Sequence, residues 1–245
     1  MNAVVISDVH LRSAEEPRAI KVLRFLNEVA PNFSSIYILG DLFDSWPGTN
    51  RLLIHKYSPI LTALEDLVRG GRRVHYIEGN HDFRLGKYFS EKLGIQVHPD
   101  YLEQDWGSKK VYLAHGDLGN PKQNGYRILR AFLRSNFTHL LLKTLPPQMI
   151  DSIGKGFSKY SRDSQKSRWV RDAQKIKNIY RETAGSIFQK GYDVVVFGHT
   201  HYPDSVAVEV MGRQCLYFNT GDWLQHFTYL EFDGREFYTK TYSDE

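Results

Sequence analysis

Short hydrophobic runs alternate with longer amphipathic segments over the first half of the chain. The runs are rich in Val, Ile, Leu and Tyr, and their length and composition predict buried β-strands at 3–6, 35–39, 73–78 and 110–114. Between them, apolar residues recur at helical spacing and predict helices at 17–30, 52–69 and 83–93. Strands that alternate with helices indicate a sheet with parallel strands and helices on its faces.

The alternation stops near the middle of the chain. From 124 to 189 the apolar residues follow helical spacing, and no strand pattern is present. Pro146-Pro147 interrupts this helical region. Gly154 and Gly156 predict a second break, which precedes a further helical run at 163–188.

We interpret this helical region as a cap, defined as residues 122–190, inserted into a single α/β domain that spans 1–245. The core resumes with Asp-Val-Val-Val-Phe at 193–197, which predicts another strand buried on both faces. Turn residues between alternating segments then predict two hairpins, 206–210 with 214–218 and 227–232 with 235–241. The cap therefore separates two parts of one predicted core.

Polar side chains with metal-ligand chemistry follow five of the predicted strands. In chain order they are Asp8, His10, Asp41, Asn80, His115, His199 and His201. Each of them alone has an ordinary explanation as a cap, a turn residue or a surface group. Because the carboxyl ends of parallel strands meet at one edge of a sheet, the joint pattern predicts one shared site. These oxygen and imidazole ligands suit Mn²⁺, Fe²⁺ or Zn²⁺ rather than Ca²⁺, and two ions that share one carboxylate would use the whole set.

The composition is that of a globular protein, with 41% hydrophobic and 24% charged residues. The single cysteine, Cys215, excludes an internal disulfide and is typical of a reducing compartment. No stretch approaches the roughly 20 apolar residues that span a bilayer, and the chain begins with a predicted strand rather than a signal peptide. We therefore expect a soluble, cytoplasmic protein.

The net charge of +4 conceals an uneven distribution. The cap carries 15 Lys/Arg and four Asp/Glu, a local balance of +11, which leaves −7 for the rest of the chain. Such a basic segment favours an anionic partner, whether a phosphorylated substrate, an acidic lipid surface or nucleic acid. A solvated helical face explains the charge equally well. Nucleic acid is the least expected partner, because the cap lacks the aromatic spacing of a base-stacking groove.

The five polar strand ends resemble, in order, the motifs of the calcineurin-like metallophosphoesterase superfamily. The matching motifs are Asp8-Val9-His10, Gly40-Asp41, Gly79-Asn80-His81-Asp82, His115-Gly116-Asp117 and Gly198-His199-Thr200-His201. The resemblance implies a four-layer αββα sandwich of two sheets, with the cap inserted, and two bound divalent ions, with Mn²⁺ expected and Fe²⁺ or Zn²⁺ as alternatives. It implies that one ion is bound by Asp8, His10, Asp41 and His201. It implies that the other is bound by Asp41, Asn80, His115 and His199, so that Asp41 bridges the pair.

A dinuclear site of this kind hydrolyses phosphoesters, because two cations polarise the P–O bonds and lower the pKa of water to near neutrality. By the same resemblance, His81 protonates the leaving oxygen or stabilises the transition state, and Asp82 orients the His81 ring. The ordinary alternative for His81 is a histidine exposed on a turn.

The position of the cap resembles that in the UDP-2,3-diacylglucosamine pyrophosphatases of lipid A synthesis. Segments 39–46, 83–87, 125–127 and 161–168 are similar to that family as well. The resemblance implies hydrolysis of UDP-2,3-diacylglucosamine, by attack at the α-phosphorus, to UMP and 2,3-diacylglucosamine 1-phosphate. It implies substrate contacts at Asn80, Tyr126, Arg127, Ser161, Arg162, Gln165, Lys166 and Arg168.

A set of apolar cap residues has two interpretations, as a binding surface for acyl chains or as the cap's own core. The set is Leu129, Leu133, Phe137, Leu140 and Leu141. In the first case the basic side chains would face phosphate and an anionic membrane, which places the protein peripherally on the inner face of the cytoplasmic membrane. Two alternatives stay open for the activity: a phosphoesterase for another nucleotide, lipid phosphate or nucleic acid, and a scaffold without turnover. The sequence predicts no oligomeric state.

Overall fold

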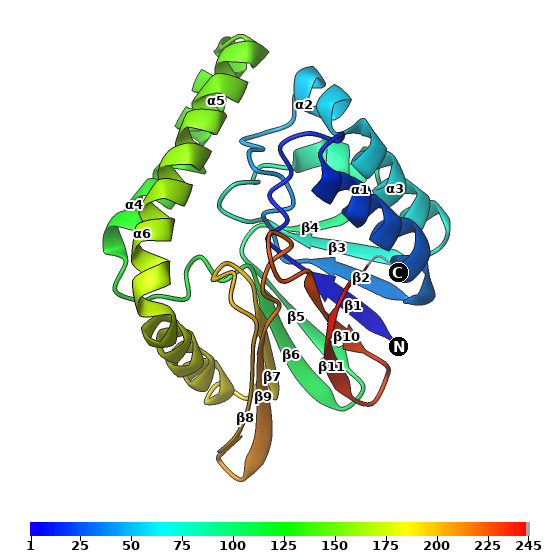
Figure 1. Cartoon of the computed structure of the whole chain (residues 1–245), viewed down its shortest axis with the longest axis vertical. Helices are drawn as coiled ribbons and strands as arrows, with labels where there is room; N and C mark the ends of the chain where they lie inside the picture. The colour runs from blue at the N-terminus through cyan, green and yellow to red at the C-terminus, as the bar shows by residue number, and fades with distance from the viewer. Residues whose placement is uncertain (244–245) are drawn as a thin grey trace.

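Two β-sheets stack face to face, and helices cover the outer face of each sheet (Figure 1). The computed structural model describes the backbone of residues 1–243, and their side chains except those of 139, 143, 147, 151, 153, 155 and 157–172. The first sheet has the order β11-β10-β1-β2-β3-β4 and consists of β11 (Phe237–Thr241), β10 (Thr228–Phe232), β1 (Ala3–Ile6), β2 (Ser35–Ile38), β3 (Arg73–Ile77) and β4 (Gln96–His98). The second has the order β5-β6-β7-β9-β8 and consists of β5 (Tyr101–Trp106), β6 (Lys109–Ala114), β7 (Val194–Phe197), β9 (Arg213–Asn219) and β8 (Asp204–Val210).

Three hydrophobic clusters separate the four layers. Successive residues of β1 point to opposite faces, so Val4 and Ile6 pack toward the outer helices while Ala3 and Val5 face the second sheet. The outer helices here are α1 (Pro17–Arg24) and α3 (Ser58–Arg69). On the other side, Val195 of β7 packs against the C-terminal part of α6 (Pro147–Phe188). The predicted four-layer αββα sandwich is confirmed.

The strands expected from hydrophobic runs are all present, but two others were missed. Neither β4 nor β5 has a hydrophobic run, because exposed polar residues alternate along β5 and β4 is a three-residue edge strand. These two strands are the neighbouring edges of the two sheets. The sequence analysis therefore predicted one strand too few in each sheet.

Two helix predictions need correction, and a third is confirmed. The continuous helix expected at 52–69 is two helices, α2 (Arg51–Lys56) and α3, because Pro59 lies in the first turn of α3 and cannot donate the hydrogen bond that continuity requires. The helix expected at 83–93 is reduced to one π-type turn, η3 (Tyr88–Lys92), because Arg84 and Gly86 have positive φ angles of 55° and 62°. The helix expected at 17–30 is present, and it continues beyond α1 as the short turns η1 (Phe25–Val29) and η2 (Ala30–Asn32).

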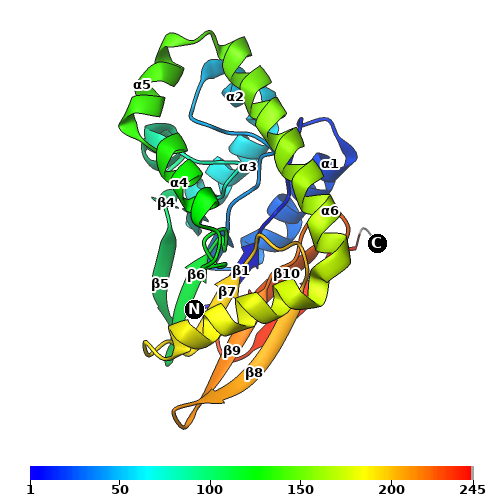
Figure 2. The ribbon, with the colours of Figure 1, turned by 90° about the vertical axis from the view of Figure 1, so that its left-hand side faces the viewer.

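The cap consists of helices alone, as predicted, namely α4 (Asn124–Leu133), α5 (Asn136–Thr144) and α6. Pro146-Pro147 separates α5 from α6, but the break expected at Gly154 and Gly156 is wrong, since α6 runs through both. Gly154 is buried against Ser45 of the core, where a side chain would collide with the serine. Figure 2 shows α6 passing along the whole molecule, from the tip of the cap to the second sheet. No helix among the described residues has both the length and the apolar character needed to cross a bilayer.

Candidate metal centre

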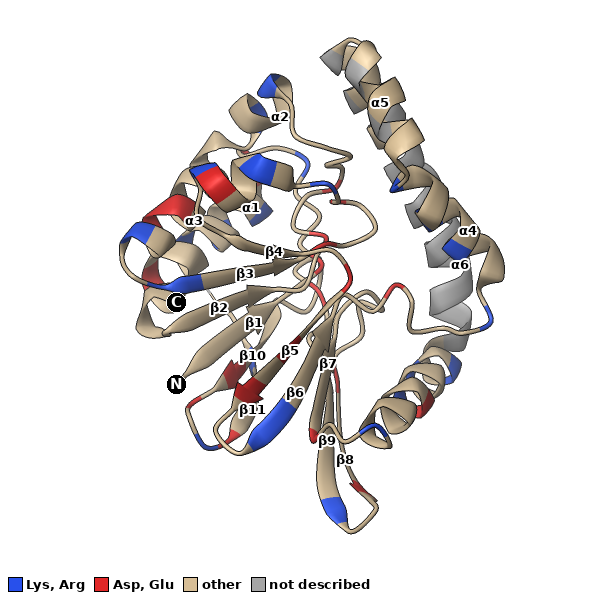
Figure 3. Ribbon diagram, turned by 180° about the vertical axis from the view of Figure 1, so that it is seen from behind, with Lys and Arg blue, Asp and Glu red and all other residues tan. Residues whose placement is uncertain are grey.

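The loops that follow β1, β2, β3, β6 and β7 converge at one edge of the sandwich, on the side that faces the cap. Figure 3 shows acidic residues gathered in these loops at the carboxyl ends of the strands. All seven sequence-predicted ligands lie here and all but Asn80 and His201 are buried. The topology therefore brings together residues from distant parts of the chain.

Asp8, His10 and His201 form one group of ligand atoms. The Nε2 atoms of His10 and His201 are 3.3 Å apart, and their rings are stacked with centroids at 5.0 Å. Asp8 Oδ1 lies 3.8 Å from His10 Nε2 and 3.5 Å from His201 Nε2. These three atoms face a common point.

A second group surrounds His115. Its Nε2 lies 2.9 Å from Asn80 Oδ1, 3.2 Å from His199 Nδ1 and 3.5 Å from Asp41 Oδ2. The same Asp41 oxygen lies 3.7 Å from Nε2 of His10 in the first group. One carboxylate oxygen thus lies between the two groups.

The backbone at the site is unusual. Five of the seven predicted ligands have φ between 52° and 65°, the left-handed region that side chains other than glycine seldom adopt; they are Asp8, His10, Asp41, His199 and His201. Such conformations cost free energy and persist only where the surrounding structure enforces them, which is typical of functional sites. Here the positive φ angles turn the backbone sharply where it leaves each strand, so that the side chains at these positions point toward the site.

The charges of the site suit cations. Burial alone would lower the pKa of His115, but the carboxylates of Asp41 and Asp8 raise it to about 10. Burial opposes ionisation of Asp41, yet the surrounding imidazoles hold its pKa well below the usual value. Asp8 Oδ1 is fully buried and has no hydrogen-bond partner among the described side chains, which is costly unless a cation lies beside it. This donor set therefore fits divalent ions.

His81 lies at the border of the first group. Its ring meets the His10 ring edge-on with centroids 4.9 Å apart, and Nδ1–H donates to the backbone carbonyl of Asp44 at 2.9 Å. His81 is 7% exposed, which excludes the alternative of an exposed turn histidine. The Asp44 side chain is also buried, and its carboxylate lies within 4.8 Å of nitrogen atoms of His10 and His81.

Asp82 has a different place from the one expected beside the His81 ring. Its Oδ1 accepts hydrogen bonds from the amides of Asp41 and Gly79, and its Oδ2 accepts from the amide of Phe43 and from the Tyr76 hydroxyl. Burial and the neighbouring Asp41 raise the pKa of Asp82 to about 7. Asp82 thus connects the two loops that carry Asp41 and Asn80, whereas the His81 ring is held by the Asp44 carbonyl.

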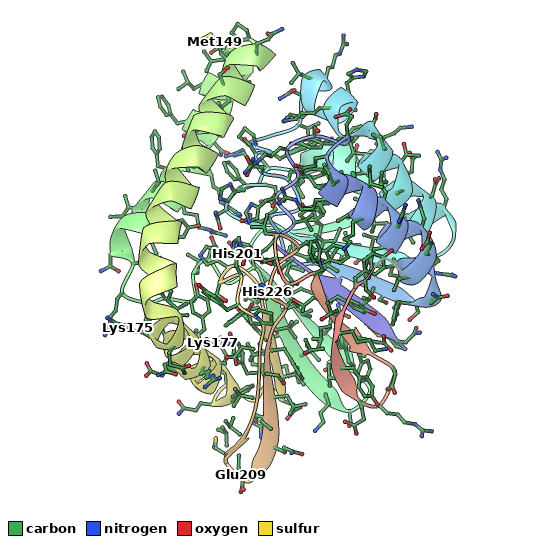
Figure 4. All side chains as sticks on the ribbon, viewed as in Figure 1. Met149, Lys175, Lys177, His201, Glu209 and His226 are labelled. Carbon is green, nitrogen blue, oxygen red and sulfur yellow. The ribbon has the colours of Figure 1, made fainter. Side chains whose placement is uncertain are left out.

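Sequence reasoning missed Asp222, which lies 3.4 Å from His201 Nδ1 and is 3% exposed. Burial favours its neutral form, but hydrogen bonds from His201 and from two backbone amides lower the pKa of Asp222 to about 2. A carboxylate on the far nitrogen of a ligand histidine fixes the orientation and tautomer of the ring. Figure 4 shows His201 next to His226, which also contacts Asp222 at 3.1 Å. The signal was present, since Gly221-Asp222 follows β9 as Gly40-Asp41 follows β2.

The predicted substrate contacts in the cap lie on two helices. On α4, the Tyr126 hydroxyl donates to Asp117 Oδ2 at 2.5 Å and Arg127 donates to the carbonyl of Leu118 at 2.9 Å. The others belong to the continuous helix α6, and their side chains lie outside the described residues; they are Ser161, Arg162, Gln165, Lys166 and Arg168. Their contacts with substrate stay a prediction.

The calcineurin-like phosphoesterase model matches residues 1–203, which include all five strand-end motifs and the cap. The chain belongs to this family. Its chemistry is the hydrolysis of phosphoesters, and the family implies a dinuclear site for divalent ions. Both groups of ligand atoms described above agree with that expectation.

Similar proteins extend the likeness over nearly the whole chain. A UDP-2,3-diacylglucosamine hydrolase of Pseudomonas paraeruginosa is 32% identical over 95% of both chains. The protein of that name from Pseudomonas aeruginosa is 31% identical, also over 95% of both chains. Another, from Stenotrophomonas maltophilia, is 28% identical over the full length of both chains.

Proposed function

We propose that this phosphoesterase hydrolyses the pyrophosphate bond of UDP-2,3-diacylglucosamine to UMP and 2,3-diacylglucosamine 1-phosphate. The observation that carries the proposal is the length of the likeness to the UDP-2,3-diacylglucosamine hydrolases, which covers 95% or more of each chain. A likeness limited to the catalytic core would indicate the reaction but not the substrate. The likeness to these hydrolases also includes the cap, which faces the site, and it therefore supports a shared substrate.

The proposed ligands follow the two groups of atoms. Asp8, His10, Asp41 and His201 would hold one ion, and Asp41, Asn80, His115 and His199 the other. The position of Asp41 Oδ2, 3.7 Å from His10 Nε2 and 3.5 Å from His115 Nε2, supports its role as the bridge. Nitrogen and oxygen donors without thiolate favour Mn²⁺, with Fe²⁺ and Zn²⁺ as alternatives. When bound, such ions polarise the phosphoryl oxygens and lower the pKa of water.

His81 is the proposed catalytic residue of the chain itself. Donation from Nδ1 to the Asp44 carbonyl fixes the ring, so that its other edge is presented toward the site. The His81 side chain would stabilise charge on the phosphorane or on the departing sugar phosphate. Because a phosphate monoester leaves readily as an anion, charge stabilisation is a more important role here than proton donation. Asp82 contributes by holding the ligand loops rather than by orienting His81.

The cap presents an unusually apolar surface for the lipid part of such a substrate. Its residues with exposed large apolar side chains are Ile128, Leu129, Phe132, Phe137, Leu140, Leu141 and Met149. Four of the five residues in the predicted set, Leu129, Phe137, Leu140 and Leu141, are at least 39% exposed, and Leu133 is half-buried, which favours a binding surface over a core of the cap. Single exposed apolar residues are ordinary, but a cluster on one helical hairpin is typical of an interaction site.

We infer that this apolar surface contacts the acyl region of an anionic membrane, while the basic residues of the cap lie near the headgroups. The protein would then act as a peripheral enzyme on the inner face of the cytoplasmic membrane. Figure 4 places Met149 at the tip of the cap, far from His201. The tip could therefore lie in the lipid while the site stays in water.

The activity is tested with purified protein, Mn²⁺ and UDP-2,3-diacylglucosamine in detergent micelles. We expect UMP and the lipid monophosphate in equal amounts, and in ¹⁸O-water the label should enter UMP, because attack is at the α-phosphorus. A nucleotide diester, a phospholipid and DNA are compared in parallel. Cleavage of any of these with UDP-2,3-diacylglucosamine left intact would refute the proposed substrate while preserving the family chemistry.

A further inference from the structure

The first helix of the cap, α4, is tied to two of the loops that carry candidate ligands. Arg134, which directly follows α4, donates from Nη2 to the carbonyl of Gly79 at 2.9 Å. Within α4, Arg130 Nε donates to Asp117 Oδ2 at 2.8 Å. Gly79 directly precedes Asn80 in the sequence, and Asp117 follows His115 by two residues. One helix therefore holds both loops.

The guanidinium of Arg134 is fixed at several points. Besides Gly79, it reaches Glu78 Oε2 at 3.1 Å and the carbonyl of Pro99 at 2.5 Å, both from Nη1. It also lies over the Phe83 ring, 5.6 Å from the ring centroid. Its side chain is 14% exposed and that of Glu78 is 8% exposed, so this pair is only weakly screened by solvent. A planar guanidinium with a fixed fork of donors locks the geometry of such acceptors.

A residue of the core also donates hydrogen bonds to the cap. Arg84, in the loop after β3, donates from Nη2 to the carbonyl of Ser135 at 2.6 Å, at the start of α5. Arg84 and Arg134 thus cross between cap and core in opposite directions. The carbonyl of Arg134 is a second acceptor for Arg84. The end of α4 cannot shift without moving the loop at 78–84.

We propose that Arg134 is a positioning residue for the second metal ion, because through the Gly79 carbonyl it fixes Asn80 against His115. The second ion is the one assigned above to Asp41, Asn80, His115 and His199, and the first ion is the one assigned to the other group of ligands. Asn80 Oδ1 and His115 Nε2 are 2.9 Å apart, so a small shift of either loop changes the distance between these two ligand atoms. The first ion is supported differently, by core residues such as Asp222 and Ser7. The cap is therefore part of the metal scaffold as well as a cover for substrate. This inference rests on the ligand assignment made for the proposed function.

The test compares Arg134→Gln with a matched control, Arg213→Gln. Arg213 also joins a carboxylate and a carbonyl across the end of the cap, with Asp193 at 2.7 Å and Phe188 at 3.0 Å, but it lies on β9 away from the ligand loops. Mn²⁺ binding is measured by equilibrium titration of the metal-free full chain, and the paired ions are followed by electron paramagnetic resonance. We expect Arg134→Gln to weaken the second ion by about 10- to 100-fold, the usual range for an outer-shell residue, and the first ion to be unchanged.

In that case the spectrum of an exchange-coupled Mn²⁺ pair gives way to that of isolated Mn²⁺ in Arg134→Gln but persists in Arg213→Gln. Wild-type affinity for both ions in Arg134→Gln, or equal weakening of the two ions, would overturn the proposal. If Arg134→Gln does not fold by circular dichroism, Arg134→Lys replaces it, because one ammonium lacks the fork that reaches Gly79 and Glu78 together. About 10-fold weakening confined to the second ion is then expected, and unchanged binding overturns the proposal. Failure of the wild-type chain to bind two ions would instead refute the proposed ligand set.

Discussion

Gly198→Ala is expected to damage the metal centre without removing any ligand. Gly198 lies between β7 and His199, where the chain passes close to the loop after β1. A Cβ atom at this position would lie 2.5 Å from Asp8 Oδ2 and 2.7 Å from Ser7 Cβ, and it would also collide with Ser7 Oγ. Ordinary van der Waals contact begins at 3.4 Å, so the alanine would displace the Asp8 carboxylate by about 0.9 Å.

That displacement breaks an existing network. Asp8 Oδ2 accepts the backbone N–H of His199 at 2.7 Å and the Ser7 hydroxyl at 2.5 Å, so two ligand loops would separate. A misplacement of about 1 Å at a reacting centre costs on the order of 100-fold in rate. Overpacking of a filled interior costs about 1–3 kcal/mol of stability. We therefore expect a folded variant with about 100-fold lower turnover and weakened Mn²⁺ binding.

The assay measures turnover, bound Mn²⁺ and the free energy of unfolding in urea. Gly185→Ala is the control, because this glycine lies within α6 and an added Cβ meets nothing within 4 Å. An alanine inside a helix should stabilise the chain by about 0.5–1 kcal/mol and leave turnover unchanged. Wild-type turnover and metal content in Gly198→Ala would show that the close approach of the two loops does not position Asp8.

Three further variants test other parts of the structure. Asp222→Asn removes the carboxylate beside His201 Nδ1, and we expect metal affinity to fall by about 10- to 100-fold in a Mn²⁺ titration. His75→Phe should flatten the loss of stability between about pH 6.5 and pH 4, measured by urea unfolding across that range, because burial lowers the pKa of His75 to about 4. Phe137→Glu combined with Leu140→Glu should abolish sedimentation with anionic vesicles but leave the hydrolysis of a water-soluble diester intact, since these exposed cap residues lie outside the metal centre.

Two of these predictions have a matched control variant, and the prediction for His75 has its own contradicting result. His226→Gln removes the other imidazole that contacts Asp222, and it should leave metal affinity nearly unchanged. In the wild-type chain burial, together with nearby His98 and Arg73, lowers the pKa of His75. Below about pH 6.5 the unfolded chain therefore binds a proton at His75 that the folded chain does not bind, and stability falls as pH drops. An unaltered pH profile in His75→Phe would contradict this cause. Tyr238→Glu, on exposed β11, should not affect vesicle binding, and vesicle binding retained by the double cap variant would exclude the cap as the membrane contact.

The sequence alone predicted most of the strands and the polar residues that follow five of them. A hydrophobic run followed by glycine and a polar residue is a local pattern, and the turn that such a glycine permits lets a buried strand end at a site. Asp41 and His199 were found in this way, and the same pattern at Gly221-Asp222 was overlooked. Local patterns did not reveal β5, because an edge strand with one exposed face needs little hydrophobicity.

The tertiary structure decided what each of these residues contacts. The ring of His81 donates from Nδ1 to the carbonyl of Asp44, 37 positions away in the chain, a contact that the sequence did not indicate. Arg134 reaches Glu78 across 56 positions, and nothing in its helical segment distinguishes it from the other basic residues of the cap. Hydrogen bonds depend on distances of a few tenths of an ångström, which packing fixes between distant segments, whereas hydrophobic pattern depends only on neighbours along the chain. The chemistry of the site was therefore encoded locally, and its geometry was set by the fold.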